Sequence, residues 1–152
     1  MFSIIAVGKM RHKAELELVD RYAKRIHPRL SIIEVNEAKG SPEEAKLKET
    51  QALLNALPDR SVVISLDEGG KNYSSLVFAN KMQAWIEQSR PISFLIGGAE
   101  GLHHAAIERS DLVLSLGSLT WPHMLVRILL AEQIYRVQTI LQGHPYHRQG
   151  RP

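Results

Sequence analysis

Cysteine is absent from this chain of 152 residues, and long apolar runs are absent too. Without cysteine the protein forms no disulfide, no thiolate metal site and no thiol nucleophile. The longest candidate for a membrane segment, 124–131, is too short and contains Arg127. The apolar start at 2–7 stops at Gly8 and Lys9, too early for the core of a signal peptide. We therefore expect a soluble, cytoplasmic protein without a membrane partner.

Charge of one sign is in small excess, because 19 lysines and arginines face 16 acidic residues. The net charge of +3 is compatible with a polyanionic partner but does not by itself indicate one. The chain does have the composition of an ordinary globular protein, with 44% hydrophobic and 23% charged residues. Its length suits one domain, and no linker or repeat divides it. We therefore expect a single domain over residues 1–152.

Short β-branched segments alternate with helical patterns along the chain. Strands are expected at 3–7, 30–35, 61–66, 92–96 and 112–115. Helical faces are predicted at Leu18, Val19, Tyr22 and Ile26, at Phe78, Met82, Trp85 and Ile86, and at Met124, Ile128, Ala131 and Tyr135, the last in a helix running to about 141. A further helix opens with an N-cap at Ser41, a proline after it and a capping-box Glu44, and runs to about 57. This alternation predicts an α/β fold: a parallel sheet with helices on both faces.

Three loops that follow predicted strands are candidates for a ligand site, since ligands bind beyond the carboxyl ends of parallel strands. They span 66–71, 97–101 and 116–123. The glycines of the second loop allow close approach of backbone N–H groups to a ligand, although Ile96 occupies the first position of a dinucleotide fingerprint. The third loop is largely apolar and suits main-chain contacts to a flat adenine, or else is an ordinary crossover.

Charged and titratable residues near the C-terminus are the other candidates. Arg127 and Glu132 interrupt an apolar helix, and a buried charge needs a partner or a function. Arg127 is expected either to pair with Glu132 or Glu100, or to serve a substrate. The segment 144–148, His-Pro-Tyr-His-Arg, holds residue types that stack on bases, bind phosphates and move protons. Of its two histidines, only His147 is a candidate for a role in catalysis.

Several phrases together resemble one known family. They are Ser65-Leu66-Asp67 with Gly70-Lys71, Leu95-Ile-Gly-Gly-Ala-Glu-Gly-Leu102, Leu119-Thr-Trp-Pro-His123, Val126-Arg-Ile-Leu-Leu-Ala-Glu132 and His144-Pro-Tyr-His-Arg148. In this order they resemble the ribosomal RNA large subunit methyltransferase H family, of the SPOUT class, which N3-methylates a pseudouridine in 23S ribosomal RNA. The resemblance extends from 6–10 to the tail and is less diagnostic over 30–59.

The resemblance implies more than the residue patterns do. It implies a C-terminal deep trefoil knot, where residue patterns alone predict an unknotted sheet. It also implies S-adenosylmethionine as methyl donor without a metal, a homodimer, and 23S ribosomal RNA in the assembled ribosome as substrate. The implied cofactor contacts are Leu66, Gly97, Leu116, Gly117, Ser118, Leu119, Thr120 and Trp121. The tail, 144–152, is expected to close over the active site.

The implied reaction assigns roles to the tail, because N3 of a neutral pseudouridine carries a proton that must leave. We expect His147 to be the general base, Arg148 to anchor phosphate or base carbonyls, and Tyr146 to stack or donate a hydrogen bond. Arg127 and Glu132 are expected to position groups at the pocket wall. The basic residues Lys9, Arg11, Lys13, Lys24, Arg25 and Arg29 form either an RNA contact or a solvated surface.

Two alternatives and two departures accompany this interpretation. The chain is alternatively a non-catalytic ribosome-binding module or a methyltransferase acting on transfer RNA. The full Tyr146-His147-Arg148 set argues against the first, and the lack of room for an added RNA-binding domain argues against the second. The tail continues through 149–152, past the usual end in the family, and Trp121 occupies a site that often holds a smaller aliphatic residue.

Overall fold

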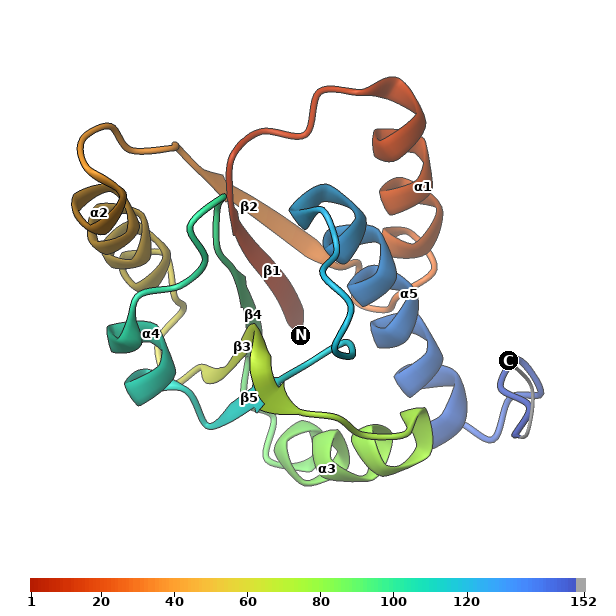
Figure 1. Ribbon diagram of the computed structural model, residues 1–152. Coiled ribbons are helices and arrows are strands. Elements are labelled where there is room, and N and C mark those ends of the chain that lie inside the picture. Colours follow the sequence, from red (N-terminus) through yellow and green to blue (C-terminus); the bar gives the residue numbers. More distant parts are fainter. Residues whose placement is uncertain (150–152) are drawn as a thin grey trace.

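The computed structural model describes residues 1–149, so the last residues of the predicted tail extension, 150–152, lie outside the described part (Figure 1). In chain order the elements are β1 (Phe2–Val7), α1 (Lys13–Ala23), β2 (Ser31–Val35), α2 (Pro42–Asn55), β3 (Val62–Lys71), α3 (Ser75–Glu87), β4 (Ile92–Ile96), α4 (His104–Arg109), β5 (Leu112–Leu114) and α5 (His123–Leu141). This strand–helix alternation confirms the predicted α/β fold. None of the described helices is long and apolar enough to span a membrane.

The five strands form one sheet in the order β2-β1-β4-β3-β5, and every neighbouring pair is parallel. In Figure 1, α1, α3 and α5 lie on one face of the sheet, and α2 and α4 lie on the other. Both faces are therefore covered, as predicted. Covering both faces explains why β1 and β4 are buried at every position and are apolar except for one serine each, instead of alternating between apolar and polar residues.

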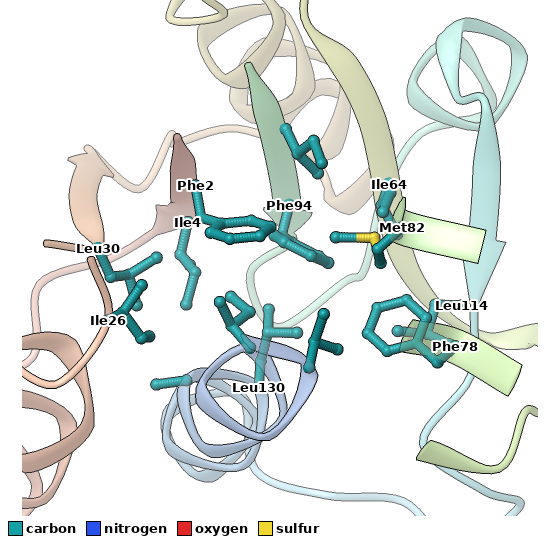
Figure 2. Close-up of a cluster of buried hydrophobic side chains, with 14 of the residues drawn as sticks. Phe2, Ile4, Ile26, Leu30, Ile64, Phe78, Met82, Phe94, Leu114 and Leu130 are labelled. Atoms are coloured by element: carbon teal, nitrogen blue, oxygen red, sulfur yellow. The ribbon is translucent and has the colours of Figure 1, made fainter. Parts of the chain in front are cut away.

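Successive strand residues point to opposite faces and so supply two separate cores. On one face, Ile4 and Phe94 pack with Leu130 of α5, and Phe78 and Met82 of α3 complete the cluster (Figure 2). On the other face, the next residues along the same strands, such as Ile5 and Leu95, pack with Leu53 of α2 and Ala106 of α4. Together these two clusters hold the carboxyl ends of the strands in a fixed arrangement.

The third strand is longer than the sequence pattern predicts. β3 continues through the expected loop to Lys71, and both Leu66 and Lys71 pair with Leu114 of β5, so the residues between them form a bulge. Gly70 is required there, because a Cβ atom would lie 2.7 Å from the carbonyl oxygen of Val113. The expected loop at 66–71 is therefore a bulged strand that wraps the edge strand β5.

Three further details of the predicted helices were wrong. Ile26, expected on the face of α1, lies after the end of that helix, although its side chain is fully buried. Ile86 of α3 is 36% exposed, while Phe78 and Met82 are buried as expected. The six-residue helix α4 was not predicted, because it buries only Ala106 and so carries too little periodicity to be recognised.

Candidate active site

The carboxyl ends of β3, β4 and β5 enclose a pocket of about 450 Å³, here called the carboxyl-end pocket. It is lined by Leu66, Asp67, Glu68, Ile96, Gly97, Gly98, Ala99, Glu100, Gly101, Leu114, Leu116, Gly117, Leu119, Thr120, Trp121, Pro122, His123 and Val126. Every predicted cofactor residue is in this set except Ser118, which is exposed in the same loop. The structure thus brings the three predicted loops together at one place.

The glycine loop after β4 forms one wall as a tight turn. The N–H of Gly101 donates to the carbonyl oxygen of Gly98 at 3.0 Å, and Gly101 has a φ of +78°. A Cβ atom on Gly97 would lie 2.6 Å from the carbonyl carbon of Gly101, so a side chain at 97 would force the turn open. From the sequence, the glycines of this loop were predicted to let backbone N–H groups approach a ligand closely. The structure adds that the loop itself closes over Gly97.

The loop between β5 and α5 forms the opposite wall. Gly117 has a φ of +112°, which favours glycine, and its N–H donates to the hydroxyl of Ser115 at 3.2 Å. Leu119 and Trp121 line the pocket yet remain 72% and 41% exposed. This wall is therefore shaped by its main chain and leaves large apolar side chains facing solvent.

The chemistry of the pocket fits an adenine nucleoside that carries a positive charge. Its volume lies in the range of small-molecule sites, and Ile96, Leu116 and Val126 supply apolar wall for a flat ring. The carboxylates of Asp67 and Glu100 line the same cavity and attract a cation. S-adenosylmethionine combines an adenine with a sulfonium and an ammonium group, so the residues present fit this methyl donor.

A second pocket of about 610 Å³ adjoins the first and shares Leu114, Leu116, Gly117 and Trp121 with it. Its other lining residues are Tyr22, Asn72, Tyr73, Ser75, Phe78, Ser115, Ile128, Leu129, Glu132 and Gln133. At its polar edge, the Ser75 hydroxyl donates a hydrogen bond to the Gln133 side-chain oxygen at 2.8 Å. Sequence reasoning missed Asn72 and Tyr73, because they follow the long strand β3 rather than the shorter strand that was expected.

Arg127 lies elsewhere and has a partner that was not expected. Its side chain is 1% exposed, and Nη1 bonds the Glu34 carboxylate at 2.7 Å, not Glu132 or Glu100. Nη2 donates to the carbonyl oxygens of Val7 and Gly8 at 2.8 and 2.7 Å. The predicted pairing was wrong because α5 presents this side chain to the ends of β1 and β2, contacts between segments far apart in sequence. Arg127 thus ties α5 to the end of β1.

The tail packs against α5 around Glu132. Two N–H groups of Arg136, at Nε and Nη2, converge on Oε1 of Glu132 at 3.0 and 2.5 Å, and the Tyr146 hydroxyl donates to the same oxygen at 3.0 Å. The Tyr146 ring lies under the guanidinium of Arg136 at 4.8 Å and edge-on to the ring of Tyr135 at 4.8 Å. Nη1 of Arg136 lies 3.1 Å from Nδ1 of His147. Glu132, Tyr146 and His147 are therefore brought together, with Arg136 as a member that the sequence did not indicate.

This cluster perturbs two of its members. Burial, the negative charge of Glu132 and the hydrogen bond to it raise the pKa of Tyr146 from 10.0 to about 12. Burial lowers the pKa of Arg136, but its hydrogen bond to Glu132 and the attraction of that carboxylate outweigh burial, so the net shift is upward. At neutral pH the phenol therefore keeps its proton and the guanidinium keeps its charge.

The tail cluster and the carboxyl-end pocket occupy different stretches of α5. Val126 lines the pocket, whereas Arg136 holds the tail, and a rise of about 1.5 Å per residue separates these positions by about 15 Å along the helix axis. Figure 1 shows the segment after α5 beyond the C-terminal end of that helix. Glu132 lies between them and lines the second pocket. Arg148 is exposed and His144 accepts a hydrogen bond from the N–H of Tyr146.

A metal site was not expected from the sequence. Within residues 1–149, no group of three histidine, aspartate or glutamate side chains is arranged to hold a metal ion.

A parallel sheet covered on both faces, with a pocket at the carboxyl ends of its strands, is an architecture in which α/β proteins bind ligands. A family model described as "Predicted SPOUT methyltransferase" matches residues 1–147. The structure is also similar to the crystal structure of a "Probable Methyltransferase" from Bordetella pertussis Tohama I, with a TM-score of 0.61 and 13% identity over 90% of this chain and 93% of that one. The class is therefore that of the SPOUT methyltransferases.

Two relatives define the family more closely. The "Ribosomal RNA large subunit methyltransferase H" of Gluconacetobacter diazotrophicus is 55% identical over 98% of both chains. The protein of the same name from Acidiphilium cryptum is 52% identical over 98% of this chain and 94% of its own length. The chain belongs to the ribosomal RNA large subunit methyltransferase H family, which confirms the resemblance found in the sequence.

Proposed function

We propose that this protein transfers a methyl group from S-adenosylmethionine to N3 of a pseudouridine in 23S ribosomal RNA. The observation that carries the proposal is the carboxyl-end pocket, which gathers residues of the three predicted ligand loops into one cavity. Membership of the methyltransferase H family supplies the expected substrate. The reaction needs little covalent chemistry from the protein, so alignment, removal of a proton and electrostatic support are its tasks.

Leu66, Gly97 and the run 116–121 would hold the methyl donor, largely through main-chain groups. Bound there, the donor supplies an activated methyl group on its sulfonium. The apolar walls would position the adenine, and the narrow turn over Gly97 would fix its depth in the pocket. Asp67 and Glu100 would favour the cationic part electrostatically. No metal takes part in this proposal.

The tail would act on the RNA base. His147 promotes loss of the N3 proton, the role predicted for it as general base, and Tyr146 orders the tail through its bond to Glu132. Arg148 is exposed and available for a phosphate or a base carbonyl. Arg127, buried between α5 and β1, would support the site by holding α5 in place. Glu132 would organise the tail.

A second copy of the chain would bring a tail to the pocket. Within one chain the tail cluster lies about 15 Å along α5 from the pocket, so closure over the pocket requires the tail to move or a partner to supply it. Leu125 and Leu129 are four residues apart on α5 and so lie on one face of it, and Trp121 lies just before this helix; the three side chains are 38–41% exposed. This apolar strip is suited to a homodimer interface.

The remaining expectations are part of the same proposal. The loop 115–122 runs from the edge strand β5, past the bulge of β3, to α5 on the face that carries α1 and α3. We propose that this passage threads the chain into the deep trefoil knot of the SPOUT class. We also propose a single domain, acting in the cytoplasm on assembled ribosomes.

The experiment is to incubate the protein with labelled S-adenosylmethionine and ribosomes that lack the modification, and then to map the methylated nucleotide. The expected product is N3-methylpseudouridine at one position of 23S RNA, formed equally by protein that was treated with a chelator and desalted before the assay and by untreated protein. Label on transfer RNA would support the transfer RNA alternative. Ribosome binding without methyl transfer would support a non-catalytic module. Activity that is lost after chelator treatment of the protein alone, and restored by adding a divalent ion back to that protein, would contradict the metal-free proposal.

A further inference from the structure

The contact between Arg136 and His147 has a direction that the atoms fix. Nη1 of Arg136 lies 3.1 Å from Nδ1 of His147. A guanidinium has N–H donors and no acceptor, so the imidazole nitrogen facing it must be the acceptor. An acceptor at Nδ1 means a neutral ring whose one proton sits on Nε2. The docked tail therefore presents Nε2–H, a donor, at the other side of the ring.

Arg136 is itself held in place and charged. Oε1 of Glu132 accepts from its Nε and Nη2, and Oε2 of Glu132 accepts from the side-chain nitrogen of Gln133 at 2.9 Å. The Tyr146 ring covers one face of the guanidinium, and its hydroxyl bonds the same carboxylate. The side chains of Glu132 and Arg136 are only 17% and 24% exposed. Nη1 is thus aimed at Nδ1 by a cluster of fixed geometry.

We propose that Arg136 is a positioning residue that fixes His147 as the Nε2–H tautomer, so that His147 serves the reaction as a hydrogen-bond donor to a carbonyl oxygen of the target base. The inference rests on the proposed function and changes one step of it. A general base needs a free lone pair on the nitrogen that faces the substrate, and in this arrangement the lone pair is at Nδ1 and is taken by Arg136. His147 with a proton on Nε2 assists in another way.

The assistance follows from the chemistry of a uracil ring. N3 lies between two carbonyl groups, and loss of its proton spreads negative charge onto their oxygens. A donor held at one of these oxygens stabilises that anion and so favours loss of the N3 proton. The proton would leave to water, and the pair left on N3 would form the bond to the methyl carbon. The bond between that carbon and the donor sulfur would break with its electron pair going to sulfur, which departs as a neutral thioether. Nε2 of His147 keeps its own proton throughout.

The first test observes the tautomer in the folded protein without substrate. Long-range ¹H–¹⁵N correlation spectra of the imidazole rings are assigned to His147 by comparison with His147→Ala. At a pH where the His147 ring is neutral, the expected pattern is a protonated Nε2 and an unprotonated Nδ1. In Arg136→Met the spectrum is expected to show a mixture of the two tautomers. Arg136→Lys, which still offers a donor, restores the pattern at least in part. The control Arg25→Met removes another cation, which lies over the Tyr135 ring, and is expected to leave the tautomer pattern of His147 unchanged.

The second test separates a donor from a base by side-chain mimicry. The amide nitrogen of Gln overlays Nε2 of His and donates without accepting a proton, whereas that of Asn overlays Nδ1. His147→Gln is expected to keep the single-turnover rate within about tenfold of the parent, and His147→Asn and His147→Ala are expected to lose about a hundredfold or more. Arg136→Met should lower the same rate at unchanged affinity for S-adenosylmethionine, with partial rescue in Arg136→Lys.

Either of two results would overturn the proposal: a proton on Nδ1 of His147 in the parent, or a His147→Gln variant as slow as His147→Ala. An unchanged tautomer in Arg136→Met would remove Arg136 from the positioning role. Failure of the proposed function is distinguishable, because the spectra need no substrate. A protein with the expected tautomer and no methyl transfer to ribosomes would contradict the substrate and leave the positioning role standing.

Discussion

At the scale of single residues, the tail is organised by one carboxylate. Oε1 of Glu132 accepts hydrogen bonds from both Arg136 and Tyr146, and through Arg136 it controls His147. Sequence reasoning named Glu132, Tyr146 and His147 separately. It did not name Arg136, although an arginine four residues after a glutamate on a helix is the spacing at which such pairs form.

The raised pKa of Tyr146 gives the tail a defined pH dependence. The neutral phenol donates to Glu132, so this bond contributes fully below the ordinary pKa of 10.0 and is lost as the pH rises towards about 12. An ultraviolet titration of tyrosinate, with Tyr146→Phe as the difference sample, should show one tyrosine ionising near the upper value. Glu132→Gln should lower that pKa. Ionisation of Tyr146 at its ordinary pKa in the parent would mean that the docked tail is not the form in solution.

Arg127 is expected to stabilise the fold. Arg127→Met removes two hydrogen bonds to carbonyl oxygens at the end of β1 and the ion pair with Glu34, so the free energy of unfolding should fall by about 3 kcal/mol. Urea unfolding measures the loss, and Arg25→Met, at a site outside the helices and strands, should change it by less than about 0.5 kcal/mol. Unchanged stability with lost methyl transfer would instead favour the substrate role that the sequence left open.

At the scale of elements, the predicted strands and most helices were confirmed, and the errors lie where contacts override local pattern. β3 runs five residues beyond its apolar segment because its bulge wraps β5. α5 buries residues on more than one stripe, since it contacts the sheet as well as α1 and α3. A single predicted face, including Met124 and Tyr135, described it incompletely. Packing on three sides is a property of the neighbours, not of the helix.

The glycine turn after β4 gives a prediction for an element of the site. Gly97→Ala places a methyl group only 2.6 Å from the carbonyl carbon of Gly101, so the turn must open and the pocket wall moves. The affinity for S-adenosylmethionine, measured by calorimetry, should fall at least about tenfold, because relieving the backbone clash costs free energy. The control is Leu47→Ala, at an exposed leucine of α2 that lines neither of the two pockets described above. Equal affinity in both variants would remove Gly97 from the site.

At the scale of the whole molecule, the exposed apolar strip predicts self-association. Leu125→Glu with Leu129→Glu places two charges on a surface proposed to be buried between copies, so sedimentation should change from dimer to monomer with the helical content retained. Leu47→Glu, at an equally exposed leucine of α2 on the other face of the sheet, should remain a dimer. If the proposed tail exchange is correct, the monomer should bind the cofactor but lose methyl transfer. A parent protein that is monomeric at working concentration would contradict the interface.

The sequence by itself determined the fold class, the family and the loops that line the pocket, because these depend on the order of short motifs and on apolar periodicity, which are local. Only the tertiary structure decided which charged side chains meet. Arg127 reaches Glu34 and β1, not Glu132, and Glu132 instead holds Arg136 and Tyr146. An ion pair depends on the distance between atoms, and residues 93 positions apart come within 2.7 Å only after the sheet has formed and α5 has packed on it.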